Sequence, residues 1–148
     1  RPEGASLYAR RLAELPMGLF AGPGYLAGRD PAALDLGRER LLVYDDSYGR
    51  LPEMDWLGGA GLTGAVGLAT GSTRALLAAA TAGAGIALLP VPIARRAGLV
   101  AVPAPLPLPR RAPWIVVHRD ARPLPGVRAV QAWITACFRA LHSPPTAG

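Results

Sequence analysis

The sequence predicts an α/β protein. Short apolar runs of strand length alternate with short segments of helical character along most of the chain, which is typical of a sheet covered by helices. The 148 residues are 51% hydrophobic, which is enough for a sizeable core and excludes a chain that is disordered throughout. No apolar run of about 18 residues is free of glycine, proline and charge, so no membrane-spanning segment is predicted.

The first part of the chain combines extended segments with short helical turns. Residues 7–21 are expected to be extended, because Pro16 excludes a helix through their middle. Pro23 suits the first position of a helix, so a single helical turn is expected there. Residues 30–36 predict a short helix that begins at Asp30, a residue type preferred at helix caps.

The next segments alternate between strand and helix. We expect a strand at residues 40–44, a polar loop at 45–49, one or two helical turns at 51–57 and a strand at 62–69 despite its glycines. This order favours a sheet whose strands are joined by helical connections.

Residues 70–90 form the most informative segment. Hydroxyl side chains precede a helix expected from Ser72 to Ala82, and the first amides of that helix have no partner within it, which favours an anion at this end. Gly83 and Gly85 end the helix and let the chain turn back. Residues 86–89 are apolar without alternation, which predicts a strand buried on both faces. Because the helix precedes the strand, the two glycines do not form a dinucleotide-binding loop.

The last part of the chain continues the alternation. We expect a helix at residues 93–97, a strand at 99–102, an extended hinge at 103–109 and a strand at 114–118, whose consecutive large apolar residues predict burial. Pro125 begins the last helix. The apolar residues that share one face of this helix are Val127, Val130, Ile134, Phe138 and Leu141.

The formal charge of +6 is carried by arginine alone, since the chain has no lysine. Residues 91–148 hold eight arginines and a single acidic residue, Asp120, whereas residues 1–90 hold eight arginines and nine acidic residues. The abundance of Ala, Gly, Pro and Arg indicates a GC-rich genome rather than selection for nucleic acid. The basic segment lacks interleaved aromatic residues, a recognition helix and a zinc motif, so we do not expect it to bind DNA directly.

The sequence predicts neither a disulfide nor a metal site. Cys137 is the only cysteine, and its apolar surroundings predict a small core residue. The two histidines are far apart and have no cysteine partner, so no metal site and no cofactor are expected. The adjacent residues Asp45 and Asp46 would point to opposite sides of a strand, so we expect them to cap a loop rather than to form an acid–base pair.

No catalytic residue is predicted. The side chains of Ser47, Ser72, His118 and Asp120 could be combined into a nucleophilic triad. However, neither serine lies in the Gly-x-Ser-x-Gly turn that presents such a nucleophile. His118 ends an apolar strand and is expected to be a structural residue at the end of the sheet. The chain is therefore not expected to be an enzyme.

Five segments, taken in order and at their spacing, carry a family resemblance. They are residues 7–15, 18–26, 51–57, 70–90 and 114–120. Together they resemble the effector-binding region of LysR-type transcriptional regulators, and the resemblance covers about residues 7 to 141.

The resemblance implies a two-lobed α/β fold like that of periplasmic binding proteins of type 2, with a ligand held between the lobes. In this chain it implies a complete effector-binding second lobe at residues 18–103 and a partial first lobe. Residues 1–17 would be a crossover strand and first-lobe remnant, 104–142 the hinge return with the C-terminal strand and helix of the first lobe, and 143–148 a flexible tail. The winged helix-turn-helix DNA-binding domain and the early strands of the first lobe would lie upstream, outside this chain.

The resemblance also implies a function. Members of this family sense small metabolites, often carboxylates, in the cytoplasm and usually assemble as homo-oligomers that bind DNA through the separate domain. Their ligand contacts correspond here to Thr70, Gly71, Ser72, Thr73, Gly85 and Ile86. Gly71 stands where many members carry a polar side chain, which removes one donor and leaves the backbone amides and flanking hydroxyls to hold the ligand.

Several alternatives stay open from the sequence. Thr70 and Ser72 either cap the helix only or also contact an effector, and Arg74 either points into solvent or pairs with a bound carboxylate. Tyr25 either lines the ligand cleft or packs over its own turn. The alternative functions are a solute-binding protein of a transporter, which shares the two-lobed fold, and a small α/β enzyme. With the first lobe partial, we expect this chain to bind effector weakly and to associate through bare strand edges.

Overall fold

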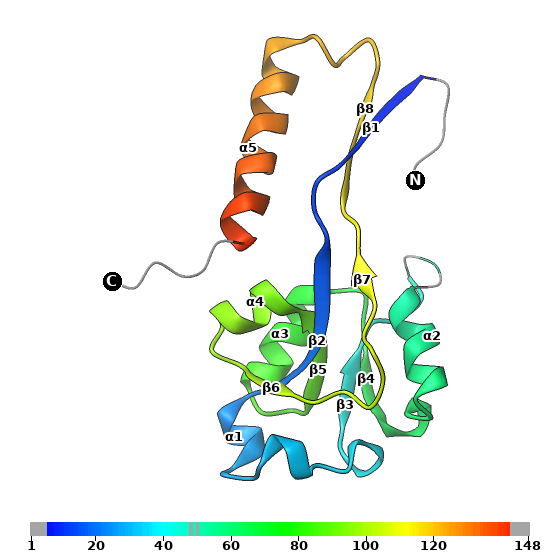
Figure 1. The fold of residues 1–148 in the computed structure, drawn as a ribbon, viewed down its shortest axis with the longest axis vertical. Helices are drawn as coiled ribbons and strands as arrows, with labels where there is room; N and C mark the ends of the chain where they lie inside the picture. The colour runs from blue at the N-terminus through cyan, green and yellow to red at the C-terminus, as the bar shows by residue number, and fades with distance from the viewer. Residues whose placement is uncertain (1–5, 48, 50, 143–148) are drawn as a thin grey trace. The chain divides into compact units, whose positions relative to one another are not determined.

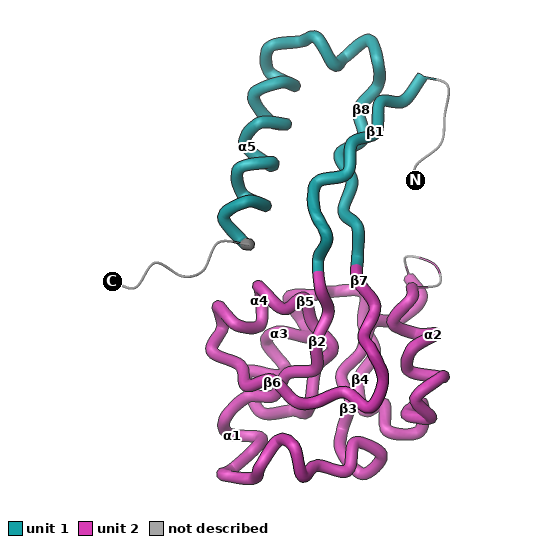
Figure 2. The backbone as a smooth tube through the Cα atoms, viewed as in Figure 1, with its two compact units in different colours: residues 1–15, 111–148 teal, residues 16–110 magenta. Residues whose placement is uncertain are grey.

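The computed structural model describes residues 6–47, 49 and 51–142 and divides the chain into two compact units. Unit 1 comprises residues 1–15 and 111–148, and unit 2 comprises residues 16–110 (Figure 2). The tail expected at residues 143–148 lies outside the described residues. None of the helices in the described part of the chain is long and apolar enough to cross a membrane.

Unit 2 is built on a mixed sheet with the strand order β4-β3-β5-β2-β6 (Figure 1). Strand β3 is parallel to both β4 and β5, whereas β2 is antiparallel to β5 and β6. A short strand, β7 (Arg110–Arg111), pairs with β2 outside this path. The strands of the main path are β2 (Leu15–Ala21), β3 (Leu41–Val43), β4 (Val66–Ala69), β5 (Ile86–Pro90) and β6 (Val100–Val102).

Helices and 3-10 turns connect these strands. The four α-helices are α1 (Pro23–Leu26), α2 (Pro52–Gly59), α3 (Thr73–Thr81) and α4 (Val91–Arg96), and the 3-10 turns are η1 (Pro31–Ala33), η2 (Leu36–Arg38) and η3 (Thr63–Ala65). All four α-helices were expected from the sequence, but two other predictions need correction. Residues 30–36 form no continuous helix: the cap at Asp30 holds a single 3-10 turn, and a second cap at Asp35 starts another. The predicted strand at 62–69 begins only at Val66, because the glycine-rich start of that segment folds as the turn η3.

The parallel strands give the sheet of unit 2 two chemically different edges. Strands β4, β3 and β5 run in one direction, so their carboxyl ends lie together and their amino ends lie together at the opposite end of the strands. These two ends are called the carboxyl edge and the amino edge of the sheet. Helix α3 connects β4 to β5 and therefore runs back from the carboxyl edge to the amino edge. Its nine residues span about 13 Å at the usual helical rise.

The core of unit 2 lies on strands β3 and β5. Every residue of both strands is buried, as the sequence predicted for the apolar run at 86–89. Leu76 and Ala80 of α3 pack into the same core and have no exposed surface. Gly85 is required by this packing, since a Cβ atom there would lie 2.3 Å from the Arg40 carbonyl oxygen.

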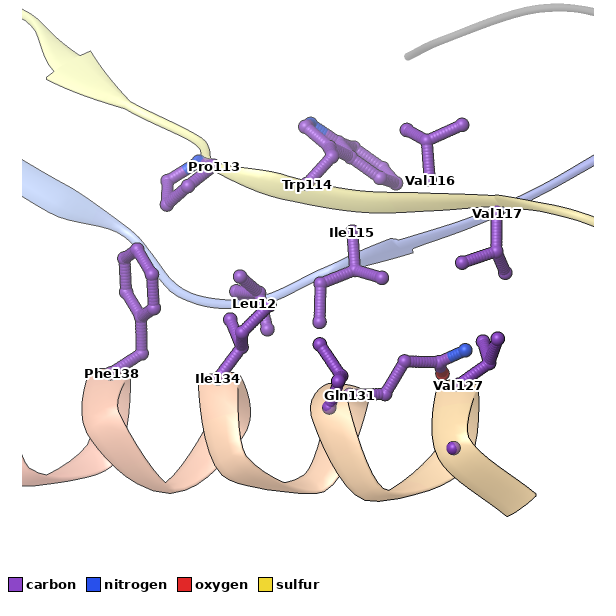
Figure 3. A pocket seen from close by; sticks show the side chains of 12 residues that line it. Leu12, Pro113, Trp114, Ile115, Val116, Val117, Val127, Gln131, Ile134 and Phe138 are labelled. Atoms are coloured by element: carbon purple, nitrogen blue, oxygen red, sulfur yellow. The ribbon is translucent and has the colours of Figure 1, made fainter. Parts of the chain in front are cut away.

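Unit 1 is a two-stranded ribbon with one helix. Strands β1 (Leu7–Arg11) and β8 (Trp114–His118) pair antiparallel, and α5 (Pro125–His142) follows β8 in the chain (Figure 1). The burial predicted for residues 114–118 is wrong for most of them: Ile115 is buried, but Val116 is 40% exposed. Side chains alternate along a strand, so Ile115 and Val117 face α5 while Trp114 and Val116 lie on the other face of the ribbon (Figure 3).

The helix α5 also leaves apolar surface uncovered. The side chains of Val127, Ile134 and Phe138 border a groove of about 630 Å³ between α5 and the ribbon, as the helical spacing predicted (Figure 3). Cys137 was expected in the core but is exposed, because it precedes the groove-lining Phe138 by one position and therefore lies on another face of the helix.

Candidate functional site

The loops that follow β3 and β4 meet at the carboxyl edge of the sheet in unit 2. The Thr70 amide donates a hydrogen bond to the Val43 carbonyl at 3.1 Å, and the Asp45 amide donates to the Thr70 carbonyl at 3.4 Å. These two bonds continue the β3–β4 ladder past the ends of the strands. They hold Asp45 beside the loop that leads into α3. Ligands of open α/β sheets bind at this kind of edge, outside the carboxyl ends of parallel strands.

Two hydroxyls organise the amino end of α3. The Ser72 hydroxyl oxygen accepts a hydrogen bond from the Ala75 amide at 3.2 Å, which confirms Ser72 as the helix cap. The Ser72 amide in turn donates to the Thr70 hydroxyl oxygen at 3.2 Å. The Thr73 hydroxyl lies 2.9 Å from the Tyr44 hydroxyl, so this first helical residue is tied to the end of β3.

The Asp45 carboxylate lies beside the loop that precedes α3. The Asp45 side chain accepts hydrogen bonds from the Ser47 amide at 3.0 Å and from the Ser47 hydroxyl, which confirms the loop-capping role expected for it. Hydrogen bonds from the Ser47 side chain and amide, and from the Gly71 amide, lower the pKa of Asp45 against a smaller opposing effect of desolvation. Asp45 is therefore ionised at neutral pH and places a negative charge next to Gly71.

Two amides remain for a ligand at this end of α3. In the first turn, no partner is found among the described residues for the backbone amides of Thr73 and Arg74, whereas those of Gly71, Ser72 and Ala75 are used by side chains. The Arg74 side chain is exposed. The amino end of α3 is therefore partly occupied by the protein and partly open.

The other two predicted contact residues lie elsewhere. Gly85 and Ile86 are at the amino edge of the sheet, one length of α3 away from Thr70–Thr73. Ile86 has no exposed surface, and its amide donates to the Arg40 carbonyl at 2.9 Å. The structure thus brings Thr70, Gly71, Ser72 and Thr73 together but does not bring Gly85 and Ile86 to them.

Tyr25 contacts the residues that follow its helical turn, and none of its polar or cation–π contacts among the described residues is with Thr70–Thr73. Its hydroxyl donates to a Glu39 carboxylate oxygen at 2.6 Å, and the Arg29 guanidinium lies 5.3 Å from the centre of its ring. Arg29 also pairs with Glu39 at 2.7 Å. The hydrogen bond from Tyr25, followed by the contact with Arg29, lowers the pKa of Glu39 although partial burial opposes this.

The residues considered for a nucleophilic triad have other roles. Ser72 caps α3 and Ser47 binds Asp45 in unit 2, whereas His118 and Asp120 are exposed in unit 1, with 3.4 Å between the imidazole Nδ1 and the carboxylate. Among the described residues, no three His, Cys, Asp or Glu side chains gather as metal ligands would.

Sequence reasoning did not assign Tyr44 or Asp45 to this site. Both directly follow the buried strand β3, and this position is the signal that could have found them. A polar residue directly after a buried parallel strand lies at the carboxyl edge, where ligands of such sheets bind.

Comparison with known proteins identifies the family. Residues 1–139 match the LysR substrate binding domain. The chain belongs to this family. Its fold is the type 2 periplasmic-binding-protein-like fold, and it is the effector-sensing part of a LysR-type transcriptional regulator. Membership of this family does not favour a solute-binding protein of a transporter.

Several solved structures are similar to this chain. The AmpR effector binding domain from Citrobacter freundii has a TM-score of 0.63 at 21% identity, covering 93% of this chain and 70% of that chain. The apo regulatory domain of HypT from Salmonella typhimurium has a TM-score of 0.64 at 21% identity, covering 93% and 68%. The full-length AphB virulence activator of Vibrio cholerae has a TM-score of 0.60 at 19% identity, and this chain covers 49% of it. No curated protein sequence matches the chain significantly.

Proposed function

We propose that this chain senses a small carboxylate-bearing effector through Thr70, Gly71, Ser72 and Thr73 at the carboxyl edge of unit 2. The observation that carries the proposal is the pair of open amides, those of Thr73 and Arg74, at the amino end of α3. Such amides bind anions because they point outward and because the helix dipole favours negative charge there. Membership of a family of effector-binding domains supports a ligand role for this edge.

The residues of the loop have different parts in this proposal, and the Gly71 amide, which binds Asp45, holds the loop in place. The amides of Thr73 and Arg74 donate to the carboxylate, and the Thr73 hydroxyl adds a third donor next to the Tyr44 hydroxyl. Ser72 and Thr70 hold the loop in place through the cap and the Ser72 amide. Arg74 is exposed and free to approach the bound carboxylate, which offsets the unfavourable position of a cation in the first turn.

Asp45 opposes the same ligand. Two unit charges about 4 Å apart repel each other by about 1 kcal/mol in a medium as polar as water. The ionised Asp45 therefore limits the affinity for an anion and favours effectors whose carboxylate binds on the Thr73 side of the loop. Replacing this charge is a direct way to test the sign of the charge on the effector.

The chain does no chemistry on the effector in this proposal. The two serines considered as nucleophiles already serve as a helix cap and as a partner of Asp45. Effector binding instead changes the populations of conformations of the regulator. The regulator contacts DNA through a domain outside this chain and works as a homo-oligomer in the cytoplasm.

A pair of variants at Thr73 tests the site. Thr73→Pro removes both the amide and the hydroxyl, and proline is well tolerated at the first position of a helix after an extended residue such as Ser72. Thr73→Ala removes the hydroxyl but keeps the amide, so the two variants differ at the proposed donor. Calorimetric titration with acetate, succinate and benzoate as probes should show about tenfold weaker binding by Thr73→Pro than by Thr73→Ala.

A third variant, Asp45→Asn, tests whether the negative charge of Asp45 weakens the binding of an anion. It should bind these carboxylates about threefold more tightly than the wild-type chain at low salt, because the repelling charge is gone. Equal affinities of Thr73→Pro and Thr73→Ala would exclude the amide as a ligand, and unchanged or weaker binding of these carboxylates by Asp45→Asn would show that the Asp45 charge does not oppose an anion at this site.

A further inference from the structure

A second polar hollow lies in unit 1 and takes no part in the proposed function. It has a volume of about 620 Å³ and is bordered by four arginines, Arg10, Arg119, Arg122 and Arg128. They come from strand β1, from the connection between β8 and α5, and from α5 itself. No acidic residue borders the hollow.

Two of the four guanidinium groups are held by the protein. Arg10 Nη2 donates to the Thr135 hydroxyl oxygen at 2.5 Å, and this hydroxyl donates to the Gln131 carbonyl at 2.6 Å, which anchors Arg10 to α5. The Arg122 guanidinium lies 4.0 Å from the centre of the Tyr8 ring, a cation–π contact that fixes its position. These contacts restrict the side chains without neutralising their charge.

The charge around the hollow is not balanced within the described residues. None of the four arginines forms an ion pair with a carboxylate there. Asp120, the acidic residue nearest in the sequence to Arg119, Arg122 and Arg128, is 91% exposed at its side chain and pairs with His118. Glu14, the acidic residue nearest to Arg10, pairs with Arg11 at 2.6 Å. Unit 1 as a whole has eight arginines and three acidic residues, so it carries +5 of the chain's net charge of +6.

A neutral donor lies beside the same hollow. Gln131 lies between this hollow and the apolar groove of Figure 3 and borders both, and its Nε2 atom is buried with no hydrogen-bond partner among the described residues. Buried amide nitrogens almost always donate a hydrogen bond, so an unused one next to a cavity indicates a missing acceptor. This observation is independent of the arginine charges, and a phosphate oxygen in the hollow would accept the missing hydrogen bond.

We propose that this hollow is a binding site for a small phosphate-bearing molecule. Guanidinium groups donate two parallel hydrogen bonds to phosphate oxygens, and several of them match the multiple charges of a phosphate group better than those of a monocarboxylate. Four arginines around a concave space fit a compact anion. A DNA backbone would instead be met by a strip of positive charge along an open surface.

Titration of the 148-residue chain with pyrophosphate tests the proposal. At about 150 mM NaCl, calorimetry should show saturable binding of one pyrophosphate per chain. The double variant Arg119→Gln with Arg128→Gln should bind about 10- to 100-fold more weakly, because two charge-assisted donors are lost. No hydrogen bond or ion pair of either side chain is found among the described residues, and circular dichroism will show whether the variant keeps its secondary structure.

Two controls separate a built site from general attraction. The variant Arg95→Gln with Arg96→Gln removes the same charge from exposed positions on α4 in unit 2, and its affinity should stay within about twofold of the wild type. Thr135→Val keeps every charge but releases Arg10, so it should weaken binding about threefold to tenfold.

Three outcomes would overturn the proposal. The first is no binding of pyrophosphate at millimolar concentration. The second is an equal loss of affinity in the unit 1 and unit 2 double variants, which would show attraction by net charge alone. The third is displacement of pyrophosphate by a duplex of about 12 base pairs that binds more tightly through the same arginines, which would make nucleic acid the ligand.

Discussion

The two units of this chain contain similar apolar segments but cover them to different degrees. In unit 2, strands β3 and β5 lie inside a sheet with helices packed against it, and their side chains have almost no exposed surface. In unit 1, a two-stranded ribbon faces one helix, and Val130 and Trp133 of that helix are 54% and 67% exposed. An apolar run therefore becomes buried only where enough neighbouring elements exist to cover both of its faces. Three or more strands, or packing against further elements, are usually needed for a stable sheet.

This comparison predicts that the two units respond differently to loss of side-chain volume. Leu89→Ala in β5 should reduce the free energy of unfolding by about 3 kcal/mol, because it leaves a cavity in a closed core. Val116→Ala in β8 should reduce it by less than about 1 kcal/mol, because solvent already reaches this side chain. Urea unfolding, monitored by hydrogen exchange at single amides, measures the loss of unfolding free energy in both variants. Equal effects would show that Val116 is covered in solution.

Added volume should separate the units in the same way. Gly85→Ala places a Cβ atom against the Arg40 carbonyl and should destabilise unit 2 by about 2 kcal/mol. Gly126→Ala on α5 meets no atom within 4 Å and should leave stability unchanged or raise it slightly, since alanine favours helix. Thermal unfolding of the two variants measures the contrast. A destabilised Gly126→Ala variant would show that another part of the protein packs against Gly126.

The cap of α3 is a smaller test within unit 2. Ser72→Ala removes the hydrogen bond to the Ala75 amide and should cost about 1 kcal/mol, with faster hydrogen exchange in α3 and no change in α5. Thr81→Ala, at the exposed opposite end of α3, is the matched control and should have almost no effect. Spread of the faster exchange into unit 1 would show that the units unfold together.

Acid should lower the free energy of unfolding of unit 2 through Glu39. Its pKa is lower in the folded protein than in the unfolded chain, so it contributes stability above the unfolded pKa near 4.5 that is lost as the pH falls through the folded pKa. The urea midpoint of the wild type should therefore fall as the pH drops below about 4.5, and Glu39→Gln should show a shallower decline. An unchanged slope in the variant would exclude Glu39 as a source of the acid sensitivity.

Local sequence patterns predicted most elements but not every degree of burial. Proline and glycine positions, such as Pro23 and Gly83, correctly marked where helices begin and end, because they act through backbone geometry alone. The strand at 114–118 was correctly predicted, but its burial was not, since burial depends on what else packs against the strand. The same limit explains Cys137, whose apolar neighbours in sequence do not share its face of α5.

In the candidate site too, contacts between residues close in sequence could be predicted and contacts between distant residues could not. The cap at Ser72 and the loop at Asp45 depend on residues close in sequence, and both could be inferred without coordinates. The contacts of Asp45 with Gly71 and of Tyr44 with Thr73 join residues far apart in the chain, so they emerged only with the sheet. The separation of Gly85 and Ile86 from Thr70–Thr73 likewise follows from the direction in which α3 crosses the sheet.

For this protein, spacing of apolar, proline, glycine and hydroxyl residues was sufficient to infer an α/β chain, its helix ends and its family resemblance. These features depend on interactions within a few residues, whose energies do not need the rest of the chain. Three other features depend on segments distant in sequence: the covering of apolar faces, the open amides of α3 and the gathering of arginines at one hollow. Only the packing of these segments in three dimensions brings the residues concerned together.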